Sequence, residues 1–388
     1  MHILSAAKMQ GTNSAQYAWA SLRRFHNVGY TSGRISDIHK ISKRDKRNAG
    51  KQADQIRFFL MQAKEYFDAS KSVTLVTRPV LLYYCAMCLA TSEVLFKQSG
   101  DISLDRARDR HRHHGLEFVN KHPKRTVDKI TESAAGLRAK PALRPKAGAP
   151  ASKERYGTFE LWQESAREAP LPADIEQRQG LASTTSYGAI LTSADSRLGF
   201  LPVAGLTLLE IVAHIPGMAR LLSQMGVEPR IIRAHTHLLV TEGQTQTRVT
   251  IHPGEEALID EFLDNVLVNP NDVDGVTYNE FPSGGQIIAT TTADRSVLRL
   301  IFPPCTCEEY PHICFWPTRQ SLNEFGFLYV ALYIVGNYAR YYPDFWIHDV
   351  ERCTELGLMV EELLSVAERR LALLTLSELT QTLFVPAA

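Results

Sequence analysis

The residues best suited to chemistry form a run of alternating arginines and histidines in the first third of the chain. The run contains Arg106, Arg108, Arg110, Arg112, His113 and His114. Histidine titrates near neutral pH and serves as a general acid or base, and an arginine guanidinium can bind two phosphate oxygens at once. RNA cleavage by attack of its own 2′-hydroxyl needs such a base, and a cation that stabilises the phosphorane. The residue types therefore suit metal-independent RNA cleavage.

Three interpretations of this run stay open: catalysis, binding of phosphate or an acidic partner, and a solvated basic surface without a site. For catalysis the sequence nominates Arg108, His113 and His114. For nucleic-acid binding it nominates the arginines around them: Arg106, Arg110 and Arg112. Gly115 follows the histidines directly, so this segment also suits a turn that caps a helix.

A second candidate lies near the C-terminus, where Arg340 and Tyr341 precede Pro343. An arginine beside tyrosines can stack on a base and hold a phosphate, so both residues are candidates for nucleic-acid binding. The structural alternative is that Arg340 bonds carbonyl groups at a helix end while the tyrosines pack with their hydroxyls at the rim. If the helices that carry these groups pack together, we expect Arg340 to lie near His114.

Cysteine and histidine also occur together further along the chain. The set comprises Cys305, Cys307, His312 and Cys314, all of types that zinc accepts. Their spacing is not that of a common zinc knuckle, so buried cysteines without metal are the favoured interpretation. His235 and His237 would face one side of a strand, but no third ligand is close in sequence. We therefore expect no cofactor and no metal.

Two apolar, aromatic helices must position the candidate residues. They cover 78–96 and 323–346, and each is apolar on nearly every face. The longest apolar run, 325–335, is shorter than the roughly 20 residues that a membrane helix needs, so no membrane association is predicted. Since neither helix can stay exposed to water, we expect the two to pack together in one core.

The predicted fold is therefore α+β: a mainly helical bundle formed by the N- and C-terminal segments, with a smaller β-containing insertion. We divide the chain into a helical part of the bundle (1–120), a basic mobile loop (121–155), a helical connector (156–231), a β-rich insertion (232–318) and C-terminal helices that complete the bundle (319–388). The loop is predicted because residues 106–155 hold 14 Lys and Arg against 5 Asp and Glu, with little apolar bulk after Ala134.

Composition bounds the class of protein. The chain has 388 residues and a formal net charge of +1, so any nucleic-acid surface must be local. Six cysteines in a chain of this length do not suggest a disulfide framework, and the first residues do not resemble a signal peptide. A cytoplasmic location is the expectation.

Several segments resemble the YaaC-like family. They are 52–70, 77–90, His114-Gly115, 157–162, 206–218 and 328–346. They occur in order over most of the chain. The family name by itself implies no particular reaction.

A wider resemblance is to HEPN-type helical bundles, through Tyr83-Tyr84 in an apolar helix followed by a loop and His114-Gly115. Many such bundles are metal-independent ribonucleases of toxin or phage-defence systems, with four to six residues between an arginine and a following histidine. Arg108 and His113 fit that spacing, whereas Arg340 and His348 are one residue too far apart. The resemblance implies a nucleic-acid-acting protein that binds RNA and forms a homodimer, with metal-independent RNA cleavage as its expected activity. The alternative is a non-catalytic binding or scaffold module that holds a protein partner in a larger complex.

Overall fold

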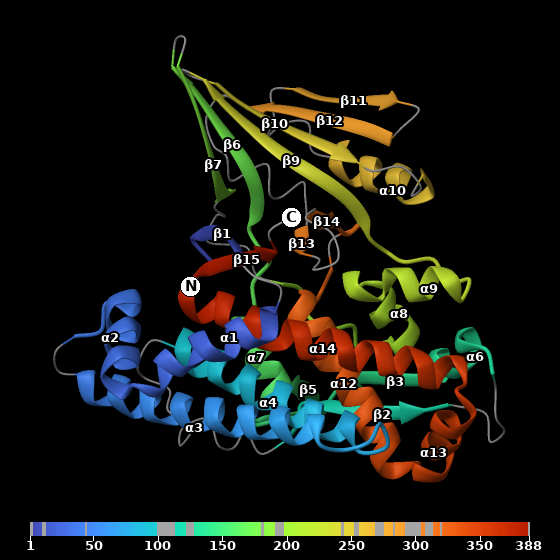
Figure 1. The fold of residues 1–388 in the computed structure, drawn as a ribbon. Coiled ribbons are helices and arrows are strands. Elements are labelled where there is room, and N and C mark those ends of the chain that lie inside the picture. The colour runs from blue at the N-terminus through green and yellow to red at the C-terminus, as the bar shows by residue number, and fades with distance from the viewer. Residues whose placement is uncertain are drawn as a thin grey trace.

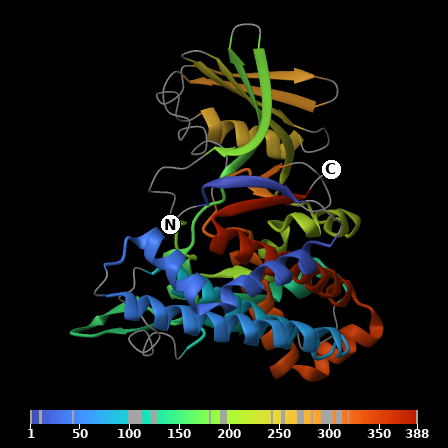
Figure 2. The same ribbon diagram turned by 60° about the vertical axis from the view of Figure 1, so that its left-hand side comes forward.

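The structure is a computed structural model of the chain. It describes residues 3–9, 13–42, 45–98, 113–121, 128–179, 182–190, 198–241, 244–251, 256–267, 275–281, 284–291, 304–306, 313–318 and 320–386. The protein has an α+β architecture, with a helical layer at one end and a twisted sheet at the other (Figures 1 and 2).

Helices from both ends of the chain share one core. The central ones are α3 (Lys46–Lys71), α4 (Arg78–Lys97), α12 (Glu324–Tyr341) and α14 (Glu355–Thr380). Helix α4 packs against each of the other three, and α12 also packs against α14. Because α4 and α12 are buried along almost their whole lengths, each needs neighbours on several sides.

Local signals begin both apolar helices where the sequence suggests. Pro79 occupies the first turn of α4, where no backbone donor is needed. The Asn323 side chain accepts a hydrogen bond from the Gly326 N–H at 3.0 Å and caps α12. Among the described residues, α4 alone is long and apolar enough to cross a membrane, but 78% of its apolar window is buried inside the protein. A buried core helix can have this length and composition, so the apolar character of α4 is only weak evidence for a membrane span.

The N-terminal segment wraps the bundle and meets the C-terminus. It comprises α1 (Ser14–Leu22), the 3₁₀ turn η1 (Arg23–His26) and α2 (Val28–His39). Helix α1 packs on α14, while η1 and α2 pack on α3. Strand β1 (Ser5–Met9) pairs in parallel with β15 (Thr382–Pro386), so the described ends of the chain lie side by side.

Among the described residues, the large sheet contains eight strands. They are β6 (Leu171–Gln179), β7 (Ala182–Ile190), β9 (Ile232–Thr241), β10 (Gln244–Ile251), β11 (Gly275–Phe281), β12 (Gly284–Thr291), β13 (Pro304–Thr306) and β14 (Ile313–Phe315). The order is β11-β12-β10-β9-β14-β13, and β6 pairs in parallel with β9 and antiparallel with β7. Helix α10 (Glu256–Leu267) lies beside this sheet (Figure 1).

Over residues 128–155 the structure shows helix and strands in place of the mobile loop that the composition predicts over 121–155, and residues 122–127 lie outside the described part of the chain. This stretch holds α6 (Ile130–Gly136), β3 (Leu137–Pro141), β4 (Leu143–Lys146) and β5 (Ala149–Arg155). Strand β3 lies between β2 (Leu116–Asn120) and β8 (Leu206–Thr207). The uncharged residues of β3, Leu137, Ala139 and Pro141, are buried on one face, while its charged residues are more exposed, and Lys140 pairs with Glu117 at 2.8 Å. Contacts with the neighbouring strands β2 and β8 bury β3, although the sequence around it has few large apolar side chains.

The segment 156–231 is also not purely helical. It contains α7 (Thr158–Ser165), α8 (Leu208–Ala213), η3 (Pro216–Met218) and α9 (Ala219–Gln224), but β6 and β7 intervene and join the large sheet. These two strands carry alternating polar and small residues without a strong apolar pattern, so the sequence gives little sign of them.

A buried polar network joins helices from both halves of the bundle. The Glu93 carboxylate on α4 accepts hydrogen bonds from the Trp162 indole N–H (3.0 Å) and the Thr375 hydroxyl (2.9 Å). Lys97 lies 3.7 Å from Glu93 and 3.0 Å from Glu378 of α14. Burial raises the pKa of Glu93 to about 7, against the opposing effect of Lys97.

Candidate functional site

The segment that carries His113 and His114 is held by the N-terminus of α7. The backbone N–H groups of Thr158 and Phe159 donate to the carbonyl oxygens of His113 (2.8 Å) and His114 (3.0 Å). First-turn N–H groups of a helix have no partner within the helix, so they are free to bind an incoming chain. The backbone of both histidines is thereby fixed against the bundle.

Two glycines make this approach close enough. Gly115 has φ +86° and Gly157 has φ +111°. A Cβ placed on Gly157 would lie 2.4 Å from both the Cα and the nitrogen of Gly115. Backbone therefore packs directly on backbone between the histidine segment and α7, which no residue with a side chain would allow.

The apolar helices α4 and α12 position the imidazole of His114. The Tyr83 hydroxyl of α4 lies 2.7 Å from His114 Nδ1, and the two rings are 5.6 Å apart. The Tyr333 hydroxyl of α12 donates to the Leu116 carbonyl oxygen at 2.7 Å, which anchors the chain just after His114. A Cβ on Gly336 of α12 would meet Tyr83 Cβ at 3.3 Å, so α12 and α4 are close at this level.

The electrostatic setting favours a neutral His114. Burial among the surrounding groups lowers the pKa of His114, and the charges of Arg340 and His113 lower it further. The side chain is nevertheless exposed on one side. Burial also raises the pKa of Tyr83 well above its ordinary value, so this hydroxyl keeps its proton and can donate or accept. A neutral, accessible imidazole is the form that accepts a proton.

Arg340 brings a cation to the same place from the last turn of α12. Its Nη1 lies 3.5 Å from the Tyr84 hydroxyl, and its guanidinium lies 5.0 Å from the centre of the Tyr341 ring. Tyr84 stacks on Tyr66 of α3 with ring centres 5.5 Å apart. Both Arg340 and Tyr341 are exposed. The site therefore combines one imidazole, one guanidinium and several aromatic rings from α3, α4 and α12.

A second group of aromatic and cationic side chains begins at His113. The His113 ring lies edge-on to the Tyr156 ring, with ring centres 4.9 Å apart. The guanidinium of Arg144 lies over the Tyr156 ring, 5.2 Å from its centre. Arg144 is itself paired with Glu154 at 2.8 Å across the β4–β5 hairpin. This hairpin, which sequence analysis assigns to a mobile loop, thus adds Arg144 to the candidate surface beside His113.

Comparison with known proteins bears on part of this site. Residues 22–132 match the family model described as YaaC-like Protein. No curated protein and no solved structure matches the chain. The YaaC-like stretch includes α3, α4 and the His113–Gly115 segment, and therefore Tyr83 and His114. Arg340 and its helix α12 lie outside it, as do the large sheet and the β4–β5 hairpin.

The predicted site residues divide into those that the structure brings together and those it does not describe. His113, His114, Arg340 and Tyr341 are described, and Arg340 acts on His114 electrostatically, as expected if the two apolar helices pack together. The remaining candidates from the basic run lie outside the described residues: Arg106, Arg108, Arg110 and Arg112.

The cysteine set is only partly described. Cys305 of β13 and Cys314 of β14 are opposite each other in the antiparallel pair, and Cys314 is buried. Cys307 and His312 lie outside the described residues. Within the part of the chain that is described, no group of three or more His, Cys, Asp or Glu is arranged to hold a metal ion.

Sequence analysis did not nominate the tyrosines around His114 as site residues. Tyr83 and Tyr84 lie in an apolar helix that suggests core packing, and Tyr66 lies in the neighbouring helix α3. Arg144 lies in the predicted loop, and Tyr156 begins the predicted helical connector. The one available signal was the adjacent pair Tyr83-Tyr84: successive residues of a helix point about 100° apart, so both can be buried only if the helix is covered on two sides.

Proposed function

We propose that this protein acts on RNA at the surface around His114, and that His114 is the general base of a metal-independent ribonuclease. The observation that carries the proposal is the 2.7 Å contact of the Tyr83 hydroxyl with His114 Nδ1, on an imidazole whose pKa is lowered by burial and by the charge of Arg340. The resemblance to HEPN-type bundles supports the same reaction class.

The proposed step uses side chains of this chain alone. The neutral His114 imidazole takes the proton of an RNA 2′-hydroxyl, and the 2′-oxygen attacks the adjacent phosphorus. The bond from phosphorus to the 5′-oxygen breaks, and the leaving oxygen receives a proton from the imidazolium. The products are a 2′,3′-cyclic phosphate and a free 5′-hydroxyl. Arg340 stabilises the extra negative charge on the phosphorane oxygens.

The residues around His114 supply the positioning that this step needs. Tyr83 holds Nδ1, so Nε2 is the ring nitrogen left to face the substrate. The exposed ring of Tyr341 and the rings of Tyr156 and His113 offer faces on which unpaired bases can stack. The substrate class is therefore single-stranded RNA or a loop of a folded RNA.

The test is incubation of the purified protein with total RNA and with tRNA in EDTA. We expect wild type to cleave, His114→Ala to lose at least about a hundredfold in rate, and Arg340→Ala to lose a similar factor. His113→Ala should lose less, since its ring contacts Tyr156 and not Tyr83. His235→Ala, on the distant strand β9, is the matched control and should cleave like wild type.

Unchanged cleavage by His114→Ala would overturn the catalytic assignment. If no variant and no wild type cleaves, the second candidate function applies: a non-catalytic module that binds RNA. The exposed Arg340–Tyr341 pair favours it, because an arginine stacked on a tyrosine is common where proteins bind unpaired nucleotides. RNA binding should then weaken with added salt and in Arg340→Ala. If neither change weakens RNA binding, the binding-module function is excluded as well.

A further inference from the structure

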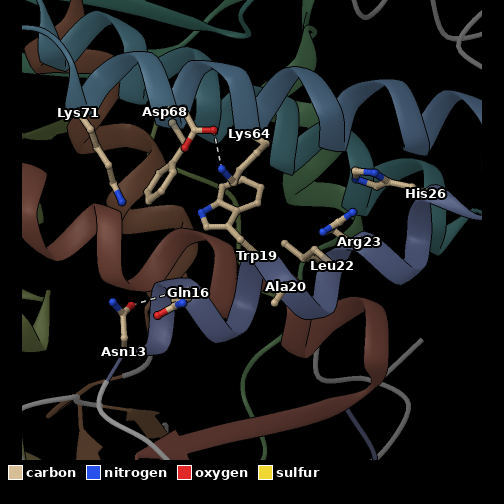
Figure 3. Close-up of a pocket in the computed structure, with 11 residues that line it drawn as sticks. Asn13, Gln16, Trp19, Ala20, Leu22, Arg23, His26, Lys64, Asp68 and Lys71 are labelled. Atoms are coloured by element: carbon tan, nitrogen blue, oxygen red, sulfur yellow. Dashed lines mark hydrogen bonds and ion pairs between the residues drawn. The ribbon is translucent and has the colours of Figure 1, made fainter.

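A groove on the opposite side of α3 from Tyr66 has the properties of a small-molecule site. It runs between antiparallel α1 and α3, and it has a volume of about 600 Å³ (Figure 3). Its floor is apolar and includes Trp19, Leu22 and Phe67, all of them buried. Pockets that take small organic ligands have volumes of roughly 300–1,000 Å³ and predominantly apolar linings.

The Trp19 side chain has an unusual feature among the four tryptophans. Trp162, Trp316 and Trp346 each donate their indole N–H to a carboxylate or carbonyl oxygen, at distances of 3.0, 2.9 and 3.0 Å. The Trp19 indole N–H has no hydrogen-bond partner among the described residues, although the side chain is only 7% exposed. Buried indole N–H groups usually have an acceptor, so this one calls for an explanation.

The charges at the groove favour an anion. Lys71 is exposed and lies 4.2 Å from the centre of the Phe67 ring, and Lys64 lies 5.9 Å from the centre of the Trp19 ring. Arg23 adds a third cation at the other end of the groove. Asp68 is the one carboxylate of the lining, and it is paired with Lys64.

His26 does not change this balance near neutral pH. Burial and the nearby charges of Arg23 and Arg57 lower its pKa, so its ring is neutral there. The groove therefore combines an apolar floor, an excess of cations along its walls and one hydrogen-bond donor without an acceptor. Figure 3 shows these groups along a single channel, with Lys71 toward one end, His26 and Arg23 toward the other, and the Trp19 ring between them.

We propose that this groove binds a small anionic amphiphile, with an elongated apolar body on Trp19 and Phe67 and one carboxylate or similar group beside Lys71. The apolar body covers the floor, the anionic group neutralises the cationic wall, and its oxygen gives the Trp19 indole N–H an acceptor. This site is separate from the surface around His114 and does not depend on the function proposed for it.

The test is a titration of ¹⁵N-tryptophan-labelled full-length protein with dodecanoate, followed through the four indole N–H resonances. Trp19→Phe identifies the Trp19 signal and keeps an aromatic floor. We expect that signal to shift saturably with dodecanoate while the other three move little. Dodecanol, which has the same chain without the charge, should bind at least about fivefold more weakly, as expected for loss of one ionic contact.

Charge variants give the matched comparison. Lys71→Met should weaken dodecanoate binding about fivefold, and Lys46→Met, an exposed lysine at the far end of the same helix, should leave it unchanged. The proposal is overturned if the Trp19 resonance does not move, if dodecanol binds as tightly as dodecanoate, or if the two lysine variants behave alike. Because both lysines are exposed, either substitution should leave the fold intact.

Discussion

At the scale of single residues, the contacts of a histidine distinguish a structural role from a functional one. His39 and His214 each bond a backbone carbonyl oxygen, that of Phe96 and of Glu210. His214 also stacks on Phe327 at 5.0 Å. His114 instead bonds a side-chain hydroxyl, keeps an exposed edge and lies under the influence of a guanidinium. These are the surroundings of a group that can exchange a proton with a ligand.

The first prediction concerns the charge that Arg340 places near His114. Arg340→Met removes a positive charge, so protonation of the imidazole becomes easier and the pKa of His114 should rise toward its ordinary value. The measurement is a pH titration of the His114 ring protons by NMR. Arg47→Met, at the exposed start of α3, should leave that pKa where it is in wild type. Equal titration curves in the two variants would mean that Arg340 does not act on His114.

At the scale of elements, a short helix decides where the histidine segment lies. Helix α7 has only eight residues, yet its first two N–H groups bind the carbonyl oxygens of His113 and His114. Gly157 stands at the N-cap with φ +111° and ψ 179°, a conformation that is strongly unfavourable for any residue other than glycine. The position of the candidate site therefore depends on a glycine that touches no ligand.

The second prediction is that Gly157→Ala destabilises the protein by about 3 kcal/mol, since it combines a strained φ with a Cβ placed 2.4 Å from Gly115. Urea unfolding measures the change. Gly50→Ala is the matched control: Gly50 lies within α3 and an added Cβ meets nothing within 4 Å. That variant should gain up to about 1 kcal/mol, because alanine is the better helix former. If the free energy of unfolding changes in the same direction in both variants, the close backbone contact and the positive φ of Gly157 do not explain its effect.

At the scale of the whole molecule, the two ends of the chain build one core. Strands β1 and β15 pair over five residues, α1 packs on α14, and α4 contacts both α12 and α14. The Glu93 network adds a polar connection between the halves, from α4 to α7 and α14. Folding of the bundle thus requires contacts that are close to the full chain length apart in sequence.

The third prediction follows from the pKa of Glu93. In the folded protein that pKa is about 7, above the ordinary value of 4.5, so the folded state binds more protons than the unfolded state between those values. The free energy of unfolding should therefore fall as pH rises from about 4.5 to 7, by at most about 1.4 kcal/mol per pH unit from this group. Glu93→Gln should flatten that slope in urea unfolding measured across this range.

The control for this prediction is Glu65→Gln, an exposed carboxylate on α3. It should leave the slope as in wild type. If Glu93→Gln has the same pH dependence as Glu65→Gln, burial of Glu93 does not govern this part of the pH dependence.

The sequence by itself determined the helical core. Helices that are apolar on nearly every face cannot remain in water, so the predicted helices 78–96 and 323–346 had to pack against each other or against other elements. In the structure the second of them ends at Tyr341, and a separate helix begins at Pro343. Pro79 and Asn323 also fixed where these helices begin, because their effects are local. Of the segments that resemble YaaC-like proteins, 52–70, 77–90 and His114-Gly115 fall within the matched residues 22–132, whereas 157–162, 206–218 and 328–346 lie outside them.

Only the tertiary structure decided which groups meet. The Tyr83–His114 bond spans 31 residues and the Arg340–Tyr84 contact spans 256, and no helical or strand period encodes such distances. In the basic stretch after Lys129, Leu137–Pro141 became strand β3 because β2 and β8 pair with its two edges, and the following residues became strands because β4 and β5 pair with each other. Local patterns indicate which face of a helix or strand must be buried. Which element buries that face, and which side chains meet there, depend on contacts between distant parts of the chain.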